Sequence, residues 1–121
     1  MVLLLASFTL AGCHRKPLAK AAQPADIGVE QLAKSPEGYA GRGITVRGVV
    51  SEIGSEGHMF TVIDEAEYRS CRELGCASYE VPVAFAGAMP ETASAVRVSG
   101  RLEQSTPGRY IVRAERVEAV R

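Results

Sequence analysis

The chain has 121 residues, a length that favours one domain, and 46% of them are hydrophobic, which is ordinary for a globular protein. It contains 14 basic and 14 acidic residues, but Arg15, Lys16 and Lys20 precede the first acidic residue, so the remainder of the chain is mildly acidic. Such a domain lacks the clustered Lys and Arg that phosphate contacts need, which disfavours general nucleic-acid binding.

The first thirteen residues, MVLLLASFTLAGC, form an apolar run that ends in small residues and a cysteine. The run is too short to cross a bilayer, which needs about 20 residues, but it suits the apolar region of a secretory signal. Leu10-Ala11-Gly12-Cys13 resembles the lipobox of bacterial lipoproteins. This resemblance implies that residues 1–12 are a signal peptide and that Cys13 carries a lipid such as palmitate. Because no Lys or Arg precedes the run, we expect translation to start further upstream.

Residues 13–25 are expected to be the lipidated cysteine and a flexible tether, since HRKPLAKAAQPA has two prolines and no periodic apolar residues. In the lipoprotein family, an Asp after the lipidated cysteine retains the protein in the inner membrane. Position 14 is His. The resemblance therefore implies a lipid-anchored protein of the bacterial cell envelope, on the outer membrane and facing the periplasm.

The segment 26–121 carries the signals of one short helix and several strands. Asp26 suits a helix N-cap and Ser35-Pro36 suits a helix end, so residues 26–35 predict a helix. From Ile44 the apolar residues alternate with polar ones, which is typical of a strand. The alternation and the turn signals between the alternating segments predict five strands: 44–53, 58–64, 79–87, 94–104 and 109–120. Within the third, Pro82 predicts an edge or a bulge.

The first and fourth predicted strands contain Gly48 and Gly100 in matching places. A glycine inside a strand permits a sharp bend, so the pair predicts coiled strands that close a small barrel. The lead-in VEQLAKSPEGYAGRGITVRGVV (29–50) resembles the opening of OB-fold domains of the tRNA-anticodon-binding-like type. This resemblance implies a mostly β domain over 26–121: a five-stranded OB-like Greek-key barrel with one short N-terminal helix. The helix common between strands three and four of that fold is nearly absent, because only GAMPETAS (87–94) fills the gap.

The stretch YRSCRELGCASYE (68–80) places Cys71 and Cys76 in the loop between the second and third predicted strands. With Cys13 assigned to a lipid, these are the two remaining cysteines, and the implied compartment is oxidising. We therefore expect a disulfide that closes the loop. The loop residues expected to form a binding surface are Tyr68, Arg69, Arg72, Glu73 and Tyr79.

Metal, haem and redox chemistry are the alternatives for the cysteine pair. A structural zinc site uses about four ligands, and Cys71, Cys76 and His58 would supply three of them. A thiol-disulfide enzyme uses Cys-x-x-Cys and covalent haem uses Cys-x-x-Cys-His, whereas here four residues separate the cysteines. The spacing thus favours a disulfide over these alternatives.

The sequence predicts a non-enzymatic, membrane-anchored binding module without a cofactor, because the motifs of the common hydrolases and of the P-loop are missing from it. Its partner is expected to be an envelope protein or a small ligand. The second hypothesis is a protein that handles metal, haem or thiol redox through Cys71 and Cys76. The third is oligonucleotide binding, which the acidic balance and the shortage of aromatic residues disfavour.

Overall fold

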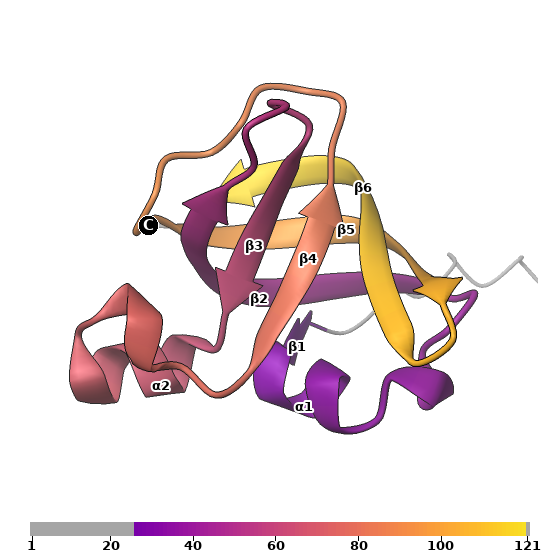
Figure 1. The fold of residues 1–121 in the computed structure, drawn as a ribbon, viewed down its shortest axis with the longest axis horizontal. Helices are drawn as coiled ribbons and strands as arrows, with labels where there is room; N and C mark the ends of the chain where they lie inside the picture. Colours follow the sequence, from indigo (N-terminus) through magenta and orange to yellow (C-terminus); the bar gives the residue numbers. More distant parts are fainter. Residues whose placement is uncertain (1–25, 121) are drawn as a thin grey trace, which may run out of the picture.

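A computed structural model describes residues 26–120 of the chain (Figure 1). The predicted signal peptide, the lipidation site Cys13 and the tether lie outside the described residues. Within 26–120, no helix is both long enough and apolar enough to span a membrane.

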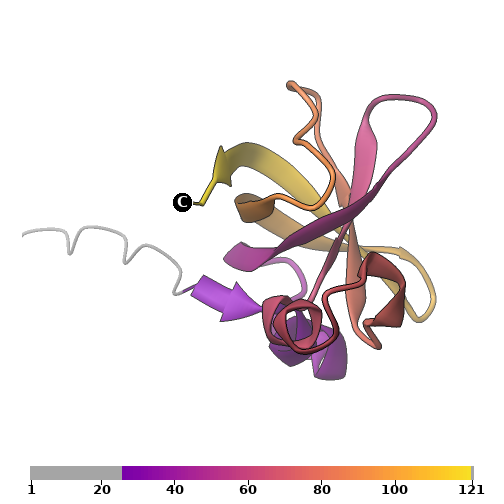
Figure 2. The ribbon, with the colours of Figure 1, turned by 90° about the vertical axis from the view of Figure 1, so that its left-hand side faces the viewer.

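The described chain is mostly β, with six strands in one sheet. The strands are β1 (Asp26–Gly28), β2 (Gly43–Ile53), β3 (Met59–Ile63), β4 (Glu80–Ala84), β5 (Ala95–Thr106) and β6 (Arg109–Ala119). Their order is β1-β2-β3-β4-β6-β5, and β2 also pairs with β5. The curved sheet therefore returns on itself through the β2–β5 pairing, as Figures 1 and 2 show. The prediction of five strands is wrong by one, because the sequence predicts a helix over residues 26–35, of which the first three form β1.

The N-terminal segment holds both a strand and a helix. Asp26, Ile27 and Gly28 form β1, which runs parallel to β2 and pairs with its residues 45–47. Asp26 is therefore not the helix N-cap; the helix α1 (Val29–Lys34) begins after Gly28, which caps it without a side-chain hydrogen bond. A three-residue strand has no periodicity of its own, and its partner strand comes only after the intervening helix. The 3-10 turn η1 (Pro36–Gly38) follows α1.

The core is aliphatic apart from one phenylalanine, and α1 closes one end of it. Buried residues alternate along β4 and the first part of β5, whereas β2 buries most of its residues. The helix α1 adds Val29 and Leu32, which are 0% and 1% exposed. Figure 1 shows α1 below the curved sheet, beside the beginning of β4. The segment 85–94 between β4 and β5 has no helix, which confirms the prediction for that connection. Here an N-terminal helix covers the core instead.

Two strand glycines lie where backbones approach closely. A Cβ atom at Gly48 would lie 2.8 Å from the carbonyl oxygen of Ile63 and 2.9 Å from a methyl group of Val29. A Cβ atom at Gly100 would collide with the backbone of Arg113, and the β5–β6 register shifts between Ser99 and Gly100. Both glycines therefore serve the tight curvature that the sequence predicts.

The predicted edge character of Pro82 agrees with its place in β4. Pro82 pairs with Thr61 of β3 on one side. On the other side, β4 pairs with β6 only at Val83 and Ala84. Proline lacks the N–H that a second neighbour would need, so it suits a position with one paired side.

Candidate functional site

The chain between β3 and β4 folds into a small lobe, residues 64–79, which projects beside the sheet (Figures 1 and 2). We call it the α2 lobe. It contains the helix α2 (Glu65–Cys71) and the 3-10 turn η2 (Leu74–Cys76), where the sequence predicts only a loop. No residue of α2 or η2 is buried. The lobe is therefore held by polar and covalent contacts, not by a hydrophobic core of its own.

Asp64 ties the α2 lobe to the rest of the fold. Its side chain is at the end of β3 and the residue is only 6% exposed. One carboxylate oxygen accepts hydrogen bonds from the N–H groups of Ala66 (3.1 Å) and Glu67 (3.2 Å), in the first turn of α2. The other oxygen accepts from the N–H of Glu30 (3.0 Å) at the start of α1. One carboxylate thus caps two helices, and its negative charge suits their N-terminal ends.

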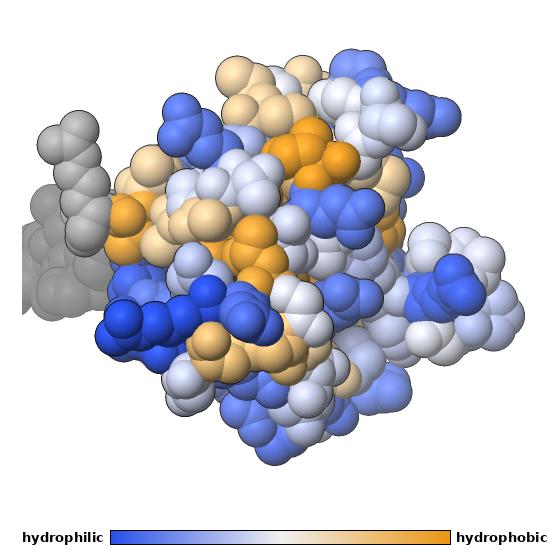
Figure 3. Space-filling model, turned by 60° about the vertical axis from the view of Figure 1, so that its left-hand side comes forward, coloured by the Kyte–Doolittle hydropathy of each residue, from blue (hydrophilic) through white to orange (hydrophobic). Residues whose placement is uncertain are grey.

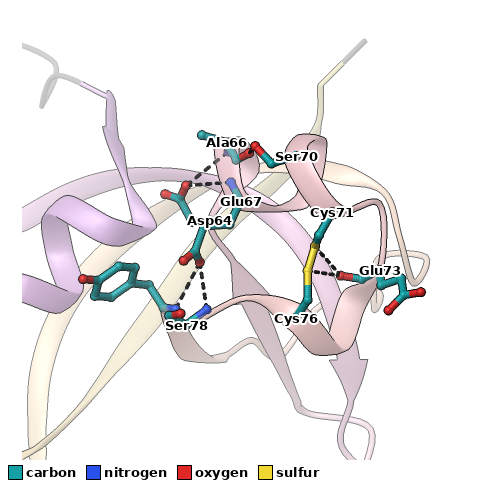
Figure 4. The surroundings of a disulfide bond; sticks show 9 residues. Asp64, Ala66, Glu67, Ser70, Cys71, Glu73, Cys76 and Ser78 are labelled. Carbon is teal, nitrogen blue, oxygen red and sulfur yellow. Dashed lines mark hydrogen bonds between the residues drawn. A yellow bond between two sulfur atoms is a disulfide. The ribbon is translucent and has the colours of Figure 1, made fainter.

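A second carboxylate and the disulfide fix the outer part of the lobe (Figure 4). Glu67 accepts hydrogen bonds from the N–H groups of Ser78 (3.0 Å) and Tyr79 (3.2 Å), which draws the return segment against α2. Cys71, the last residue of α2, is joined to Cys76, the last residue of η2, with their Cα atoms 6.6 Å apart. The disulfide agrees with the pairing that the sequence predicts. Together these contacts hold the charged segment between β3 and β4 in one conformation.

The residues predicted to form a binding surface divide into two groups. Arg69, Arg72 and Glu73 are exposed on the α2 lobe, whereas Tyr68 is partly buried. Tyr79 packs against the hydrophobic core. The Nζ atom of Lys34 lies 5.4 Å from the centre of the Tyr79 ring. The accessible part of the predicted surface is therefore its three charged residues.

His58 is not placed with the cysteines. It directly precedes β3, whereas the α2 lobe follows the other end of that strand, so the length of β3 separates them (Figure 1). Between residues 26 and 120, no three His, Cys, Asp or Glu side chains group in a way that could hold a metal ion. Cys71, Cys76 and His58 are thus not brought together into one ligand set.

A cleft of about 370 Å³ with several charged lining residues lies at the base of the α2 lobe, between β1 and α2. Its charged lining residues are Asp26, Arg47, Asp64, Glu65 and Arg69. The Glu65 carboxylate lies 2.6 Å from Arg69 and 3.7 Å from Arg47, so it compensates both guanidinium groups. The sequence gives no sign of this cleft, because it forms only when β1 and α2 come together, and neither element is predicted.

The face that OB-folds commonly use for ligands lies around their second and third strands. Here this is the outer face of β3 and β4, where Thr61 pairs with Pro82 and Ala84 follows. Stacking of single-stranded bases needs exposed aromatic side chains, and these three outward positions hold none. On the face of the molecule in Figure 3, hydrophobic residues are scattered among hydrophilic ones.

Comparisons with known proteins identify the fold. No protein-family model and no curated protein sequence matches the chain. Among solved structures, it is similar to the hypothetical protein ygiW from E. coli, with 15% identity over 80% of this chain and 89% of that chain and a TM-score of 0.53. It is also similar to the telomere capping protein Ten1 from Saccharomyces pombe, with 16% identity over 79% of this chain and 80% of that chain and a TM-score of 0.53.

A third similar structure is an aspartyl-tRNA synthetase from Leishmania major Friedlin, with 17% identity and a TM-score of 0.52. The match covers 88% of this chain but 22% of the synthetase chain. At such low identity these likenesses concern the fold alone, and the three proteins differ in function. Together with the six-stranded curved sheet, they show that the chain has an OB-like fold.

Proposed function

We propose that the chain is a lipid-anchored binding module of the bacterial cell envelope, which holds an envelope protein through its α2 lobe and catalyses no reaction. The observation that carries this proposal is the lobe, a polar excursion fixed to a rigid sheet by Asp64, Glu67 and a disulfide. Binding residues are disproportionately found on segments that a rigid scaffold positions. The exposed Arg69, Arg72 and Glu73 offer both signs of charge, which favours a polar protein surface as the partner.

Two features support the anchor and the compartment. The lipobox-like residues 10–13 favour a lipid on Cys13, and His14 in place of Asp favours the outer membrane, facing the periplasm. A disulfide between Cys71 and Cys76 suits an oxidising compartment. A tether over residues 13–25 would let the α2 lobe reach a partner some distance from the lipid.

Site-specific photocrosslinking in intact cells tests the proposed binding surface. A photoreactive residue at position 72 is expected to capture an envelope protein, because Arg72 is exposed on the lobe. The matched control is position 109, which is also an exposed arginine but lies at the β5–β6 turn. The captured protein, once identified and purified, is expected to bind Arg72→Glu about tenfold more weakly than the wild type. Equal capture at both positions would refute the assignment of the lobe.

A further inference from the structure

The C-terminal half of β6 presents an open edge of the sheet. β6 pairs with β5 along its length. On its other side it pairs with β4 only at Val112 and Arg113. Beyond Arg113, that side of β6 has no backbone partner within residues 26–120. Figures 1 and 2 show this part of β6 at the margin of the sheet, running toward the C-terminus.

The β5–β6 register identifies the backbone groups on this edge. The N–H of Val120 donates to the carbonyl oxygen of Ala95 at 2.9 Å, so Val120 faces β5 with its backbone groups. Alternate residues of an antiparallel strand direct their N–H and C=O groups to opposite sides. Val117 and Ala119 therefore direct theirs away from β5, and each offers one donor and one acceptor along the open edge. Glu115 is the extra residue at the β5–β6 register shift, so the alternation does not extend to it.

We propose that this edge binds a second copy of the chain, with the two β6 strands antiparallel about a two-fold axis at Val117. In this register Val117 pairs with Val117 of the other copy through the outward N–H and C=O groups. Arg116 of each copy then lies opposite Glu118 of the other. These are non-hydrogen-bonded pairs, in which opposite side chains approach most closely. Because the two copies are related by a two-fold axis, the Arg116–Glu118 pair occurs twice.

The order of the charges is the reason to choose a second copy as the occupant. Charged residues on an edge strand commonly prevent strand pairing. The order Arg-Val-Glu at 116–118 instead places opposite charges across from each other when two copies pair about Val117. Within one chain Arg116 and Glu118 lie 3.2 Å apart and are both exposed, so the two side chains can exchange partners without leaving a charge uncompensated.

A depression beside the edge gives a second reason. It has a volume of about 270 Å³ and lies on the core side of the strand. Its apolar lining residues are Ala88, Pro90, Val96, Val117 and Ala119. A strand added to the edge would cover this depression and remove its apolar surface from water. The inference depends neither on the lipid anchor nor on the α2 lobe, because it concerns a different part of the fold.

Sedimentation velocity of the full chain in detergent solution, over a concentration series, tests the proposal. The wild type is expected to show a concentration-dependent dimer. Arg116→Glu or Glu118→Arg alone places like charges opposite each other twice, and is expected to weaken the dimer about tenfold. The double variant R116E/E118R restores opposite charges in the same register and is expected to restore the dimer. Arg109→Glu, an equal change of charge outside the edge segment, is the control.

Val117→Pro tests the backbone pairing separately from the charges. It removes an N–H group that points away from β5, so it is expected to weaken the dimer while the β5–β6 pairing persists. Circular dichroism and the thermal midpoint of each variant report whether the monomer is folded. A wild type that stays monomeric at all concentrations overturns the proposal. A dimer that the double variant does not restore, or that Arg109→Glu weakens equally, also overturns it.

Discussion

The carboxylate of Asp64 accepts a hydrogen bond from the backbone N–H of Glu30 at 3.0 Å, although the two residues are 34 positions apart. Its other oxygen accepts from the first turn of α2. α1 and α2 have only six and seven residues, and helices this short are not stable in water by themselves. The shared cap at Asp64 therefore determines where both helices begin, and so where the α2 lobe lies against the sheet.

Replacing Asp64 is expected to destabilise the whole fold. Asp64→Ala leaves the N–H groups of Glu30, Ala66 and Glu67 without their acceptor, and should lower the free energy of unfolding by about 2–4 kcal/mol. Asp64→Asn retains one carbonyl oxygen and should lower it by about half as much. Urea unfolding, followed by circular dichroism, measures both losses.

Asp26→Ala is the matched control for this substitution. Asp26 also carries a carboxylate, but its side chain is 35% exposed and it pairs with Arg97 at 2.7 Å. An exposed ion pair of this kind contributes about 0–1 kcal/mol. If Asp64→Ala lowers the free energy of unfolding no more than Asp26→Ala does, the shared cap does not hold the two helices.

The disulfide is expected to stabilise the α2 lobe more than the sheet. Cys71→Ser/Cys76→Ser should lower the free energy of unfolding by about 2 kcal/mol, since the bond closes a short ring. Because no residue of α2 is buried, amide exchange should accelerate in the lobe while β2 and β5 stay protected. In a Cys13→Ala background, denatured protein without reductant should show no reactive thiol. Two reactive thiols would contradict the disulfide.

Local patterns suffice for most of the sheet. The alternation of apolar and polar residues locates β2 to β6, and Gly48 and Gly100 mark the places where strands bend. The strand β1 has no such signal, because three residues carry no period and its pairing with β2 depends on the fold of the intervening helix. The packing of α1 against the end of the core could not be predicted either. In the OB-fold pattern, a helix is common between the third and fourth strands instead.

The candidate site could be predicted only in part. Counting cysteines led to the pair Cys71 and Cys76, but α2 lacks the apolar stripe by which helices are recognised. One signal was present: Asp64 is followed three residues later by Glu67, which is typical of a capping box. In the structure Glu67 binds Ser78 and Tyr79 instead, and Asp64 reaches Glu30. Contacts between residues so far apart in the chain have no local pattern.

Substitution of the predicted lipid-bearing cysteine tests the proposed anchor. Cys13→Ala removes the thiol that would receive the lipid, so the protein should move from the membrane fraction to the soluble fraction when expressed in a bacterium with two membranes. The Cys71→Ser/Cys76→Ser variant, which also removes cysteines, should remain with the membrane. Membrane association that persists in Cys13→Ala would contradict the anchor. It would not bear on the role of the α2 lobe, which the crosslinking experiment tests separately.

Gly100 tests whether the return of the sheet on itself depends on a close backbone approach. It pairs with Ile44 of β2 on one side and with Ala114 of β6 on the other, next to a register shift. A methyl group there would collide with the backbone of Arg113, so Gly100→Ala should force the strands apart and lower the free energy of unfolding by about 1–3 kcal/mol. Gly38→Ala is the control, because a Cβ atom at Gly38 meets no atom within 4 Å. That variant should change the free energy by less than about 0.5 kcal/mol. Equal urea midpoints for the two variants would show that β5 can bend without a glycine at this position.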